Sequence, residues 1–545
     1  MKKSIITKIS VLFVACLSLS GCDFINRFLN PETIFDNGYI DDDPSYRPDK
    51  NPKDAVYPSY TYNDYISNNY YPKSSMPVKG TSKMLVIPIW FNDSHLFINE
   101  NDKDALKEDI RLAYFGSEEE TGWHSVASYY ENESTNLLDI TGTVSTWYEP
   151  DISYSYIAGD VNDSHTITVN LLKNATNWYF ENSEESTKDY DADGDGYLDG
   201  VVFIYAAPNW MSLKHHASNP DSITENRYGN LWAYCFWADG SSNKDNPGLN
   251  VFFWASYDFM FDHRNPQIGE YGYGDSGYTV DAHTYIHESG HMFGLDDYYD
   301  YGNDKYSPAG GFSMQDETVG AHDPFSTYSL GWAKAYIPVI SGSLRLTPFQ
   351  KDKEIIILTP NFNKFNSPFD EYLILEFYDP SNLNEKDAYT QYMSSAASGA
   401  RQPGIRLWHV DARLLFGNTE SSFYTSKNIT TNPLYNVPPI GGKGGVYMMN
   451  SNTYDSTNGH ATKVREPKAN LYNILQLIHA DNPSDALHTK LRNNSIFTEG
   501  LSFSMEAYSS QFVNGTKLNS GLDLGFNFTV KRLTKDYAEI EINKL

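Results

Sequence analysis

The chain has 545 residues, which is long enough for two or three domains that each bury a sizeable core. Its 41 Lys and Arg against 70 Asp and Glu give a net charge of −29, which argues against a nucleic-acid-binding protein and against electrostatic attachment to anionic lipid. Aromatic residues make up 15% of the chain, including 42 Tyr, which excludes a largely disordered protein and suits a Tyr-rich β architecture.

Residues 1–21 have the pattern of a secretory signal peptide. Basic residues in "MKKSIITK" precede an apolar run over 9–19 that is too short for a comfortable membrane span. The following "LSGC" resembles the lipobox of bacterial lipoproteins. This resemblance implies cleavage before Cys22, a diacylglycerol on its sulfur, and a chain anchored by lipid to the extracellular face of the cell membrane. The alternative is a plain signal peptide with a coincidental Cys.

Only three cysteines are present, and two of them lie within or directly after the signal peptide. Cys16 lies inside the signal and Cys22 is the predicted lipid attachment site, which leaves Cys235 alone. We therefore expect no internal disulfide, and we interpret Cys235 as an inert core thiol.

Residues 22–82 are rich in Asn, Asp, Pro, Ser and Tyr and show neither a helical nor a strand period. This composition predicts a polar tether that lifts the folded part off the membrane. A pro-segment is the alternative, although the segment contains no cysteine switch or dibasic cleavage signal.

Regular structure is expected from residue 83 onward. Apolar runs over 83–91, 197–207 and 250–259 predict buried strands, and the stretch 125–148 reads as a short helix followed by a hairpin. Strands mixed with a few helices predict an α+β domain with a mixed sheet over residues 83–340.

The pattern changes after residue 340. Further β-like runs, separated by long polar loops, occur at 371–379, 404–414, 472–481, 524–533 and 537–543. They predict an all-β domain over residues 341–545, antiparallel and of sandwich or jelly-roll type.

The stretch "HESGHMFGLDDYYD", which starts at His287, carries the strongest chemical signal. His287 and His291 are four residues apart, so on a helix both side chains project from one face and can reach the same tetrahedral zinc. Glu288 can approach the open coordination position, where zinc lowers the pKa of a bound water to about 7 and a carboxylate can accept its proton.

The residues after His291 complete the expected ligand set. Gly294 can adopt the left-handed turn that ends a helix, so the chain reverses and Asp297 can return to the metal. The pattern HExxHxxGxxD resembles the metzincin zinc peptidases, with Asp in place of the commoner third His. Such a protein is also expected to have a Met-turn, and "GGFSMQDE" supplies Met314. Glu317 is the alternative third ligand, as in gluzincins.

Three segments together look like the bacterial immune inhibitor A-like metallopeptidases: "HESGHMFGLDDYYD", "GGFSM" and "DPFSTYSLGWAKA". The similarity spans roughly residues 83–480 and implies an extracellular zinc endopeptidase that acts on proteins or peptides, with Glu288 as general base. Asp296 stands where this family usually has Pro, which leaves Asp296 as an alternative to Asp297. A non-catalytic adhesin or glycan-binding protein on a peptidase scaffold is the alternative function.

A second metal site is predicted by "DYDADGDGYLDG", residues 189–200. Asp191, Asp193, Asp195 and Asp199 follow the start of an EF-hand-like calcium loop. Val202 occupies the position of the usual bidentate Glu, so we expect weak affinity, as in extracellular modules. The family resemblance also implies a structural calcium here, and the alternative is an acidic surface turn.

No catalytic or metal-binding role is predicted for the other histidines considered. His283 is expected to pack near the metal or support its ligands, His215 and His216 are expected in a loop, and His409 is expected to form a buried polar pair with Asp411.

Overall fold

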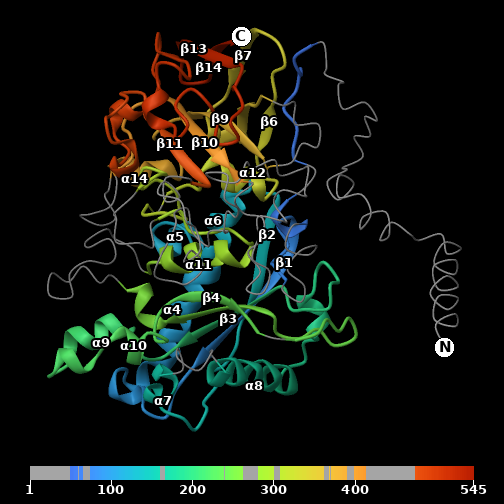
Figure 1. Cartoon of the computed structure of the whole chain (residues 1–545). Helices are drawn as coiled ribbons and strands as arrows, with labels where there is room; N and C mark the ends of the chain where they lie inside the picture. Colours follow the sequence, from blue (N-terminus) through green and yellow to red (C-terminus); the bar gives the residue numbers. More distant parts are fainter. Residues whose placement is uncertain are drawn as a thin grey trace, which may run out of the picture.

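The computed structural model describes residues 50–58, 61–64, 74–159, 166–238, 240–261, 280–299, 307–318, 320–360, 368, 370–389, 398–412 and 473–545. The signal peptide and Cys22 lie outside these residues. The fold has an α/β region with one mixed sheet and a β-rich region with two further sheets, drawn at the bottom and the top of Figure 1.

The α/β region is built on a five-stranded sheet in the order β2-β1-β3-β5-β4. Neighbours among β1, β2, β3 and β5 run parallel, and the edge strand β4 runs antiparallel to β5, so the mixed sheet is confirmed. The strands are β1 (Gly80–Ile89), β2 (Leu138–Val144), β3 (Gly200–Tyr205), β4 (Tyr234–Trp237) and β5 (Val251–Ser256). The expected hairpin over 125–148 is wrong, because β2 pairs in parallel with the distant β1.

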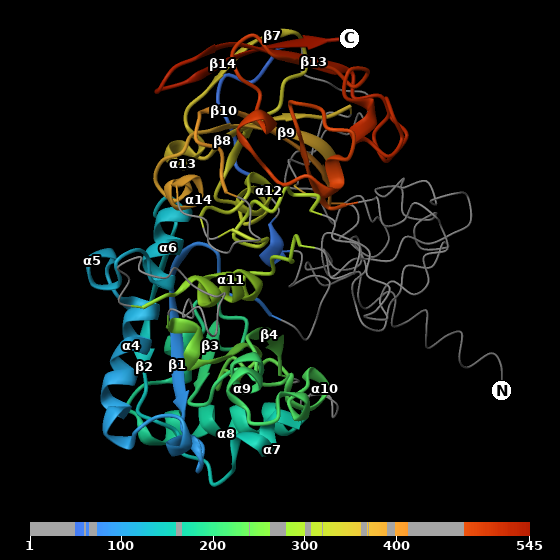
Figure 2. The same cartoon turned by 90° about the vertical axis from the view of Figure 1, so that its left-hand side faces the viewer.

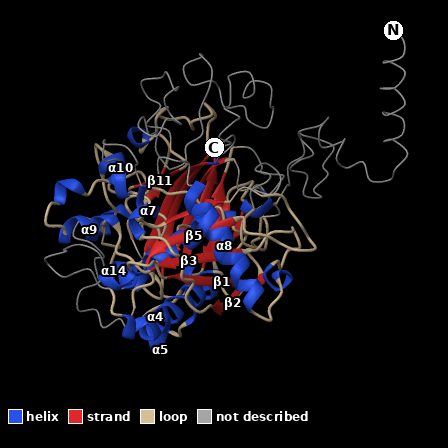
Figure 3. Cartoon of the chain, turned by 90° about the horizontal axis from the view of Figure 1, so that it is seen from below, coloured by secondary structure: helices blue, strands red, loops and turns tan. Residues whose placement is uncertain are grey.

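Helices cover both faces of this sheet, as a parallel sheet requires, because its strands are apolar on both sides. One face packs against α4, α6 and α11, and the other against α7 and α8. Figure 3 shows α8 crossing in front of the strands when the molecule is seen from below. The helices of this region are α4 (Lys103–Phe115), α5 (Glu118–Thr121), α6 (Val126–Glu133), α7 (Tyr154–Ala158), α8 (Thr166–Asn182), α9 (Trp210–His216), α10 (Glu225–Tyr228) and α11 (His283–Met292).

The β-rich region contains a sheet in the order β11-β10-β9-β8-β6 and a sheet in the order β12-β13-β14-β7. All neighbours are antiparallel except β6 and β8. The elements are β6 (Lys334–Tyr336), β7 (Gly342–Leu346), β8 (Glu354–Leu358), β9 (Glu371–Tyr378), β10 (Gly404–Asp411), β11 (Leu475–Ile478), β12 (Ser502–Phe503), β13 (Phe526–Leu533), β14 (Ala538–Lys544), and the short helices α12 (Pro324–Ser329), α13 (Phe349–Asp352) and α14 (Asn384–Tyr389). The two sheets share one apolar core, as the predicted sandwich type requires.

The two regions do not have separate cores. Ile374, Trp408 and Leu477, on the second face of the β11–β6 sheet, belong to the same buried cluster as Tyr285 and Ile286 of α11. Figure 2 shows α11 lying between the sheet of the α/β region and the β-rich region. The β-rich region is therefore part of the environment of α11 rather than a detached appendage.

Two buried ion pairs lie at this junction. Lys353, at the end of α13, is 3.0 Å from the carboxylate of Glu133 at the end of α6, and both side chains are almost completely buried. Arg406 of β10 pairs with Glu376 of β9, also with no exposure, and its guanidinium lies 4.2 Å from the ring centroid of Phe312. Charges buried at such a depth are tolerated only where an opposite charge accompanies them.

The described part of residues 22–82 packs on the fold and does not form a tether. Val56 bridges to Ala335 of β6, and the backbone N–H of Met76 donates to the carbonyl of Met292 at the end of α11. The indole N–H of Trp332 donates to the carbonyl of Val78. The tether prediction is therefore wrong for residues 50–58, 61–64 and 74–82, because backbone groups and apolar side chains such as Met76 supply contacts that composition does not reveal, and this packing is compatible with the pro-segment alternative. Within the described ranges, no helix is long and apolar enough to cross a bilayer.

Candidate metal centre

The helix α11 begins and ends through local interactions. Its first residue, His283, donates its backbone N–H to Oδ1 of Asp281 at 3.0 Å. At its other end, Gly294 has a φ of 102°, and the N–H of Leu295 donates to the carbonyl of Gly290. The left-handed turn expected at Gly294 is therefore present. It reverses the chain toward the partly buried face of α11 that carries His287 and His291.

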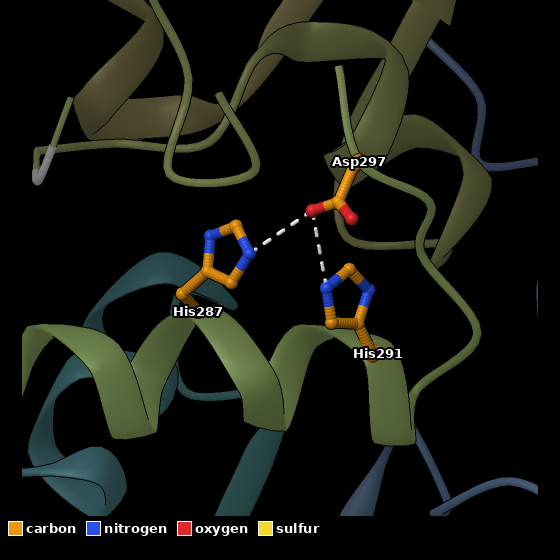
Figure 4. A group of neighbouring side chains, drawn as sticks. All are labelled: His287, His291 and Asp297. Carbon is orange, nitrogen blue, oxygen red and sulfur yellow. Dashed lines mark hydrogen bonds and ion pairs between the residues drawn. The ribbon is translucent and has the colours of Figure 1, made fainter. Parts of the chain in front are cut away.

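The imidazoles of His287 and His291 project from this face toward the carboxylate of Asp297 (Figure 4). Nε2 of His287 is 3.0 Å from Oδ1 of Asp297, and Nε2 of His291 is 3.2 Å from the same oxygen. One donor atom from each residue lies within 4.8 Å of the other two. The structure thus brings together the three side chains predicted as zinc ligands.

Backbone carbonyls orient both imidazoles. Nδ1 of His287 is 2.7 Å from the carbonyl oxygen of Met314, and Nδ1 of His291 is 2.7 Å from that of Leu295. Because a carbonyl only accepts hydrogen bonds, each Nδ1 carries the proton and donates it. In the neutral imidazoles this leaves the lone pairs on both Nε2 atoms, which face Asp297.

The alternatives to Asp297 lie outside this cluster. Asp296 precedes Asp297 but contributes no donor atom to the group, and Glu317 forms an ion pair with Lys490. Burial opposes protonation of His291, but the Asp297 carboxylate prevails and raises the pKa of His291 to about 10. The same contacts hold the pKa of Asp297 well below its usual range despite burial. An anionic carboxylate facing two imidazoles is a site that attracts a cation.

Glu288 lies on the same helix and is 9% exposed. Burial raises the pKa of its carboxyl group, whereas the imidazoles of His291 and His287 act to lower it. The backbone N–H of Cys235, in the edge strand β4, also interacts with this carboxylate. Glu288 therefore sits between the three-residue cluster and the edge of the sheet, in surroundings that raise the pKa of its carboxyl group.

Met314 lies beside the cluster with 1% of its surface exposed. The turn before it contains Gly310 and Gly311, with φ values of 72° and 70° that favour glycine. Its contribution to the cluster is the backbone carbonyl that orients His287. Sequence reasoning missed Gln315, which follows Met314 and contacts His291, because a glutamine carries no metal-site signal.

The second predicted site is brought together only in part. Asp191, Asp193 and Asp195 each place a carboxylate oxygen within 4.8 Å of the others, and Oδ1 of Asp191 is buried without a hydrogen-bond partner. The carboxylate of Asp199 instead accepts hydrogen bonds from the backbone of Ala192 and the hydroxyl of Ser82. The prediction of Asp199 as a ligand is therefore not supported, since its oxygens are occupied in closing the loop.

Gly196 lets a second loop cross this turn. It has a φ of 92°, and a Cβ at this position would lie 2.4 Å from Oγ of Ser242. The N–H of Asn243 donates to the carbonyl of Gly196 at 3.0 Å. The acidic turn is thus held by its neighbours and is not a free surface loop.

The remaining residues singled out in the sequence lie outside both metal-binding groups. His283 lies 3.3 Å from Asp281 and outside the metal-binding group. His215 and His216 are exposed on α9 and do not lie in a loop. His409 pairs with Glu371 at 2.9 Å, whereas Asp411 accepts a hydrogen bond from Asn519, so the expected His409–Asp411 pair is wrong. Cys235 is half-buried and packs against the core, so the expected core position is only partly correct, and its surroundings raise the pKa of the thiol well above its usual value.

Comparison with known proteins does not extend this description. No protein-family model matches the chain, and no curated protein matches it in sequence.

Proposed function

We propose that this protein is a zinc-dependent endopeptidase. The observation that carries the proposal is the convergence of Nε2 of His287, Nε2 of His291 and Oδ1 of Asp297 on one point beside Glu288. The three donors come from one helix and the turn that follows it, in the order HExxHxxGxxD. This order and the adjacent Met314 support assignment to the metzincin-type peptidases and, with the other motifs, to the immune inhibitor A-like group.

The donor set fits zinc in both chemistry and spacing. Zinc prefers imidazole nitrogen and carboxylate oxygen, and two tetrahedral ligands at usual bond lengths lie roughly 3.3 Å apart. The separations of 3.0 and 3.2 Å between the Nε2 atoms and Oδ1 of Asp297 are close to that value. His287, His291 and Asp297 would hold the zinc, and a set of three protein ligands is typical of catalytic rather than structural zinc sites.

Zinc held by His287, His291 and Asp297 would supply a Lewis acid and would lower the pKa of water to about 7. Glu288 accepts the proton of the attacking water and later donates it to the leaving amine. Its burial beside β4 keeps the carboxylate in surroundings that strengthen this proton transfer. The antiparallel edge strand β4 supports a peptide substrate, because an extended chain adds readily to the edge of a sheet.

Two further assignments accompany this proposal. The turn that holds Asp191, Asp193 and Asp195 binds a structural calcium. Cys22 carries a lipid that anchors the enzyme to the extracellular face of the cell membrane, and incorporation of labelled palmitate that is lost in Cys22→Ser tests the anchor.

The test of the peptidase is metal content by mass spectrometry, combined with casein digestion in the presence and absence of a zinc chelator. We expect about one zinc per chain and cleavage that the chelator abolishes. Glu288→Gln should retain the zinc and lose at least a hundredfold in kcat/KM. Glu317→Gln, a change to a nearby carboxylate outside the metal-binding cluster, is the matched control and should leave both properties unchanged.

The outcomes separate the alternatives. Loss of zinc in Glu317→Ala but not in Asp297→Ala supports the gluzincin arrangement and contradicts the ligand set. Zinc that binds to wild-type protein without any cleavage of casein or of a peptide library supports the non-catalytic binding protein.

A further inference from the structure

Gln315 contacts both segments that carry the proposed zinc ligands. Nε2 of its side-chain amide lies 3.5 Å from Nδ1 of His291 on α11. Its backbone carbonyl accepts the N–H of Tyr298, the residue after Asp297, at 2.7 Å. The side chain of Gln315 is completely buried. A single residue thus joins the helix that supplies two ligands to the loop that supplies the third.

The helix makes room for this contact at Gly290. A Cβ added to Gly290 would lie 2.3 Å from Oε1 and 2.8 Å from Cδ of Gln315, closer than side-chain atoms approach one another. Glycine inside a helix costs about 1 kcal/mol relative to alanine. The close approach of Gln315 is a reason for glycine at this position.

Oε1 of Gln315 lies 3.2 Å from Nε2 of His322, which is also fully buried. Nδ1 of His322 is 3.0 Å from the hydroxyl of Tyr129 on α6, and this hydroxyl donates to the carbonyl of Gly320 at 2.8 Å. A continuous chain of polar side chains therefore runs from the metal-binding helix through Gln315 and His322 to α6.

Donors and acceptors can be matched along this series of contacts. The hydroxyl of Tyr129 gives its proton to Gly320, so it accepts one from Nδ1 of His322, and Nε2 of His322 is an acceptor. Nδ1 of His291 is a donor because it bonds to the carbonyl of Leu295. The amide is placed with Nε2 toward His291 and Oε1 toward His322, and a 180° rotation about its terminal bond satisfies both neighbours, because the nitrogen then donates to Nε2 of His322 and the oxygen accepts from Nδ1 of His291. This arrangement keeps the proton of His291 on Nδ1 and leaves Nε2 for the metal.

We propose that Gln315 is a positioning residue of the metal centre, held in place by His322 and Tyr129, and that it sets the zinc affinity of the protein. This inference rests on the proposed function, because it assumes that zinc binds to His287, His291 and Asp297. Gln315 does not contact the metal in this role. It acts through the orientation of His291 and through the distance between α11 and the Asp297 loop, and partners of this kind typically contribute a factor of 10–100 to metal affinity.

The test measures the zinc dissociation constant of the full chain by competition with a chromophoric chelator. Gln315→Met keeps the length of the side chain but removes both hydrogen bonds, and we expect it to weaken zinc binding about 10–100-fold. Gln315→Glu keeps an acceptor for Nδ1 of His291 but loses the donor to Nε2 of His322, so it should recover part of the affinity that Gln315→Met loses. Circular dichroism of the metal-free variants verifies that they are folded.

Tyr129→Phe provides an independent variant that retains the buried ring and loses only the hydroxyl. It should weaken zinc binding in the same direction but by less, because His322 loses one of its partners. Tyr205→Phe is the matched control, since Tyr205 is equally buried and also donates a hydrogen bond to a backbone carbonyl, that of Trp232, outside the chain of contacts. It should leave zinc affinity unchanged.

The inference is overturned if folded Gln315→Met binds zinc as tightly as wild-type protein, or if its affinity falls no more than that of Tyr205→Phe. In those cases the proposed function still stands, because wild-type protein binds zinc. Wild-type protein that binds no zinc contradicts the proposed function, and this inference fails with it.

Discussion

The backbone carbonyl of Met314 accepts a hydrogen bond from Nδ1 of His287 at 2.7 Å, although the two residues are 27 positions apart in the chain. The contact with the metal-binding cluster is thus made by the main chain of Met314, while its thioether is packed in the core. The turn and the side chain of this residue therefore have separable roles.

Met314→Leu should consequently retain the metal centre. Leucine has a similar volume, so we expect a loss of less than about 1.5 kcal/mol in the free energy of unfolding and a zinc affinity within a few-fold of wild type. Chemical denaturation and chelator competition measure the two quantities. A tenfold or greater loss of zinc affinity at unchanged stability means that the side chain itself supports the site.

Gly290→Ala should destabilise the protein, against the usual preference of helices for alanine. Propensity alone predicts a gain of about 1 kcal/mol. The clash of the new Cβ with the Gln315 amide at 2.3 Å reverses the sign, and we expect a loss of about 1–3 kcal/mol together with weaker zinc binding.

Ser289→Ala, at the neighbouring buried position of α11, is the control for a change in the same helical turn. Adding Gln315→Ala to Gly290→Ala should restore part of the lost stability, because it removes the clashing group. Gly290→Ala protein that is more stable than wild type contradicts the close approach.

Lys353→Met should strongly destabilise the junction between the two regions. The substitution leaves the Glu133 carboxylate buried without its cation, which typically costs about 3–5 kcal/mol. Lys334→Met, which breaks the more exposed pair with Glu354, should cost less than about 1 kcal/mol. Denaturant unfolding measures the free energy of unfolding of both variants. Equal effects of the two substitutions contradict the importance of the buried pair.

Acidification should remove the stability contributed by histidines that are buried in their neutral form, among them His124, His322 and His479. Burial lowers the pKa of His124 and of His479 from 6.5 to about 4. Between pH 6.5 and 4 the unfolded state binds protons at these histidines that the folded state does not, so their contribution to the free energy of unfolding decreases as pH falls, whereas carboxyls with raised pKa values such as Glu133 and Asp296 act in the opposite direction. Each histidine accounts for up to about 3 kcal/mol of the loss.

The measurement is denaturant unfolding of metal-free protein as a function of pH. His479→Gln should show a shallower decline than wild type, whereas His95→Gln, a change at an exposed histidine, should follow the wild-type curve. A His479→Gln curve that parallels wild type down to pH 4 contradicts the assignment.

Calcium should raise the thermal stability of the protein. A site as weak as those of extracellular modules yields about 1–3 kcal/mol at 10 mM calcium. Asp193→Asn should abolish this calcium-dependent increase in Tm. Asp199→Asn should lower the Tm with and without calcium but keep the increase, because Asp199 bonds to Ala192 and Ser82. An increase that survives in Asp193→Asn places the calcium elsewhere.

The sequence by itself determined the features that depend on local spacing. His287, His291, Gly294 and Asp297 lie within eleven consecutive residues, so helix periodicity and one left-handed turn were enough to predict their convergence. The buried strands were likewise evident from continuous apolar runs.

Only the tertiary structure decided which distant groups surround these features. The parallel pairing of β2 with β1, the packing of residues 50–58 and 74–82, the partner of His409 and the role of Asp199 all depend on contacts between segments far apart in the chain. The groups that orient the imidazoles of His287 and His291 are backbone carbonyls, which every residue type carries. Their position follows from the path of the chain and leaves no signal in the pattern of residues.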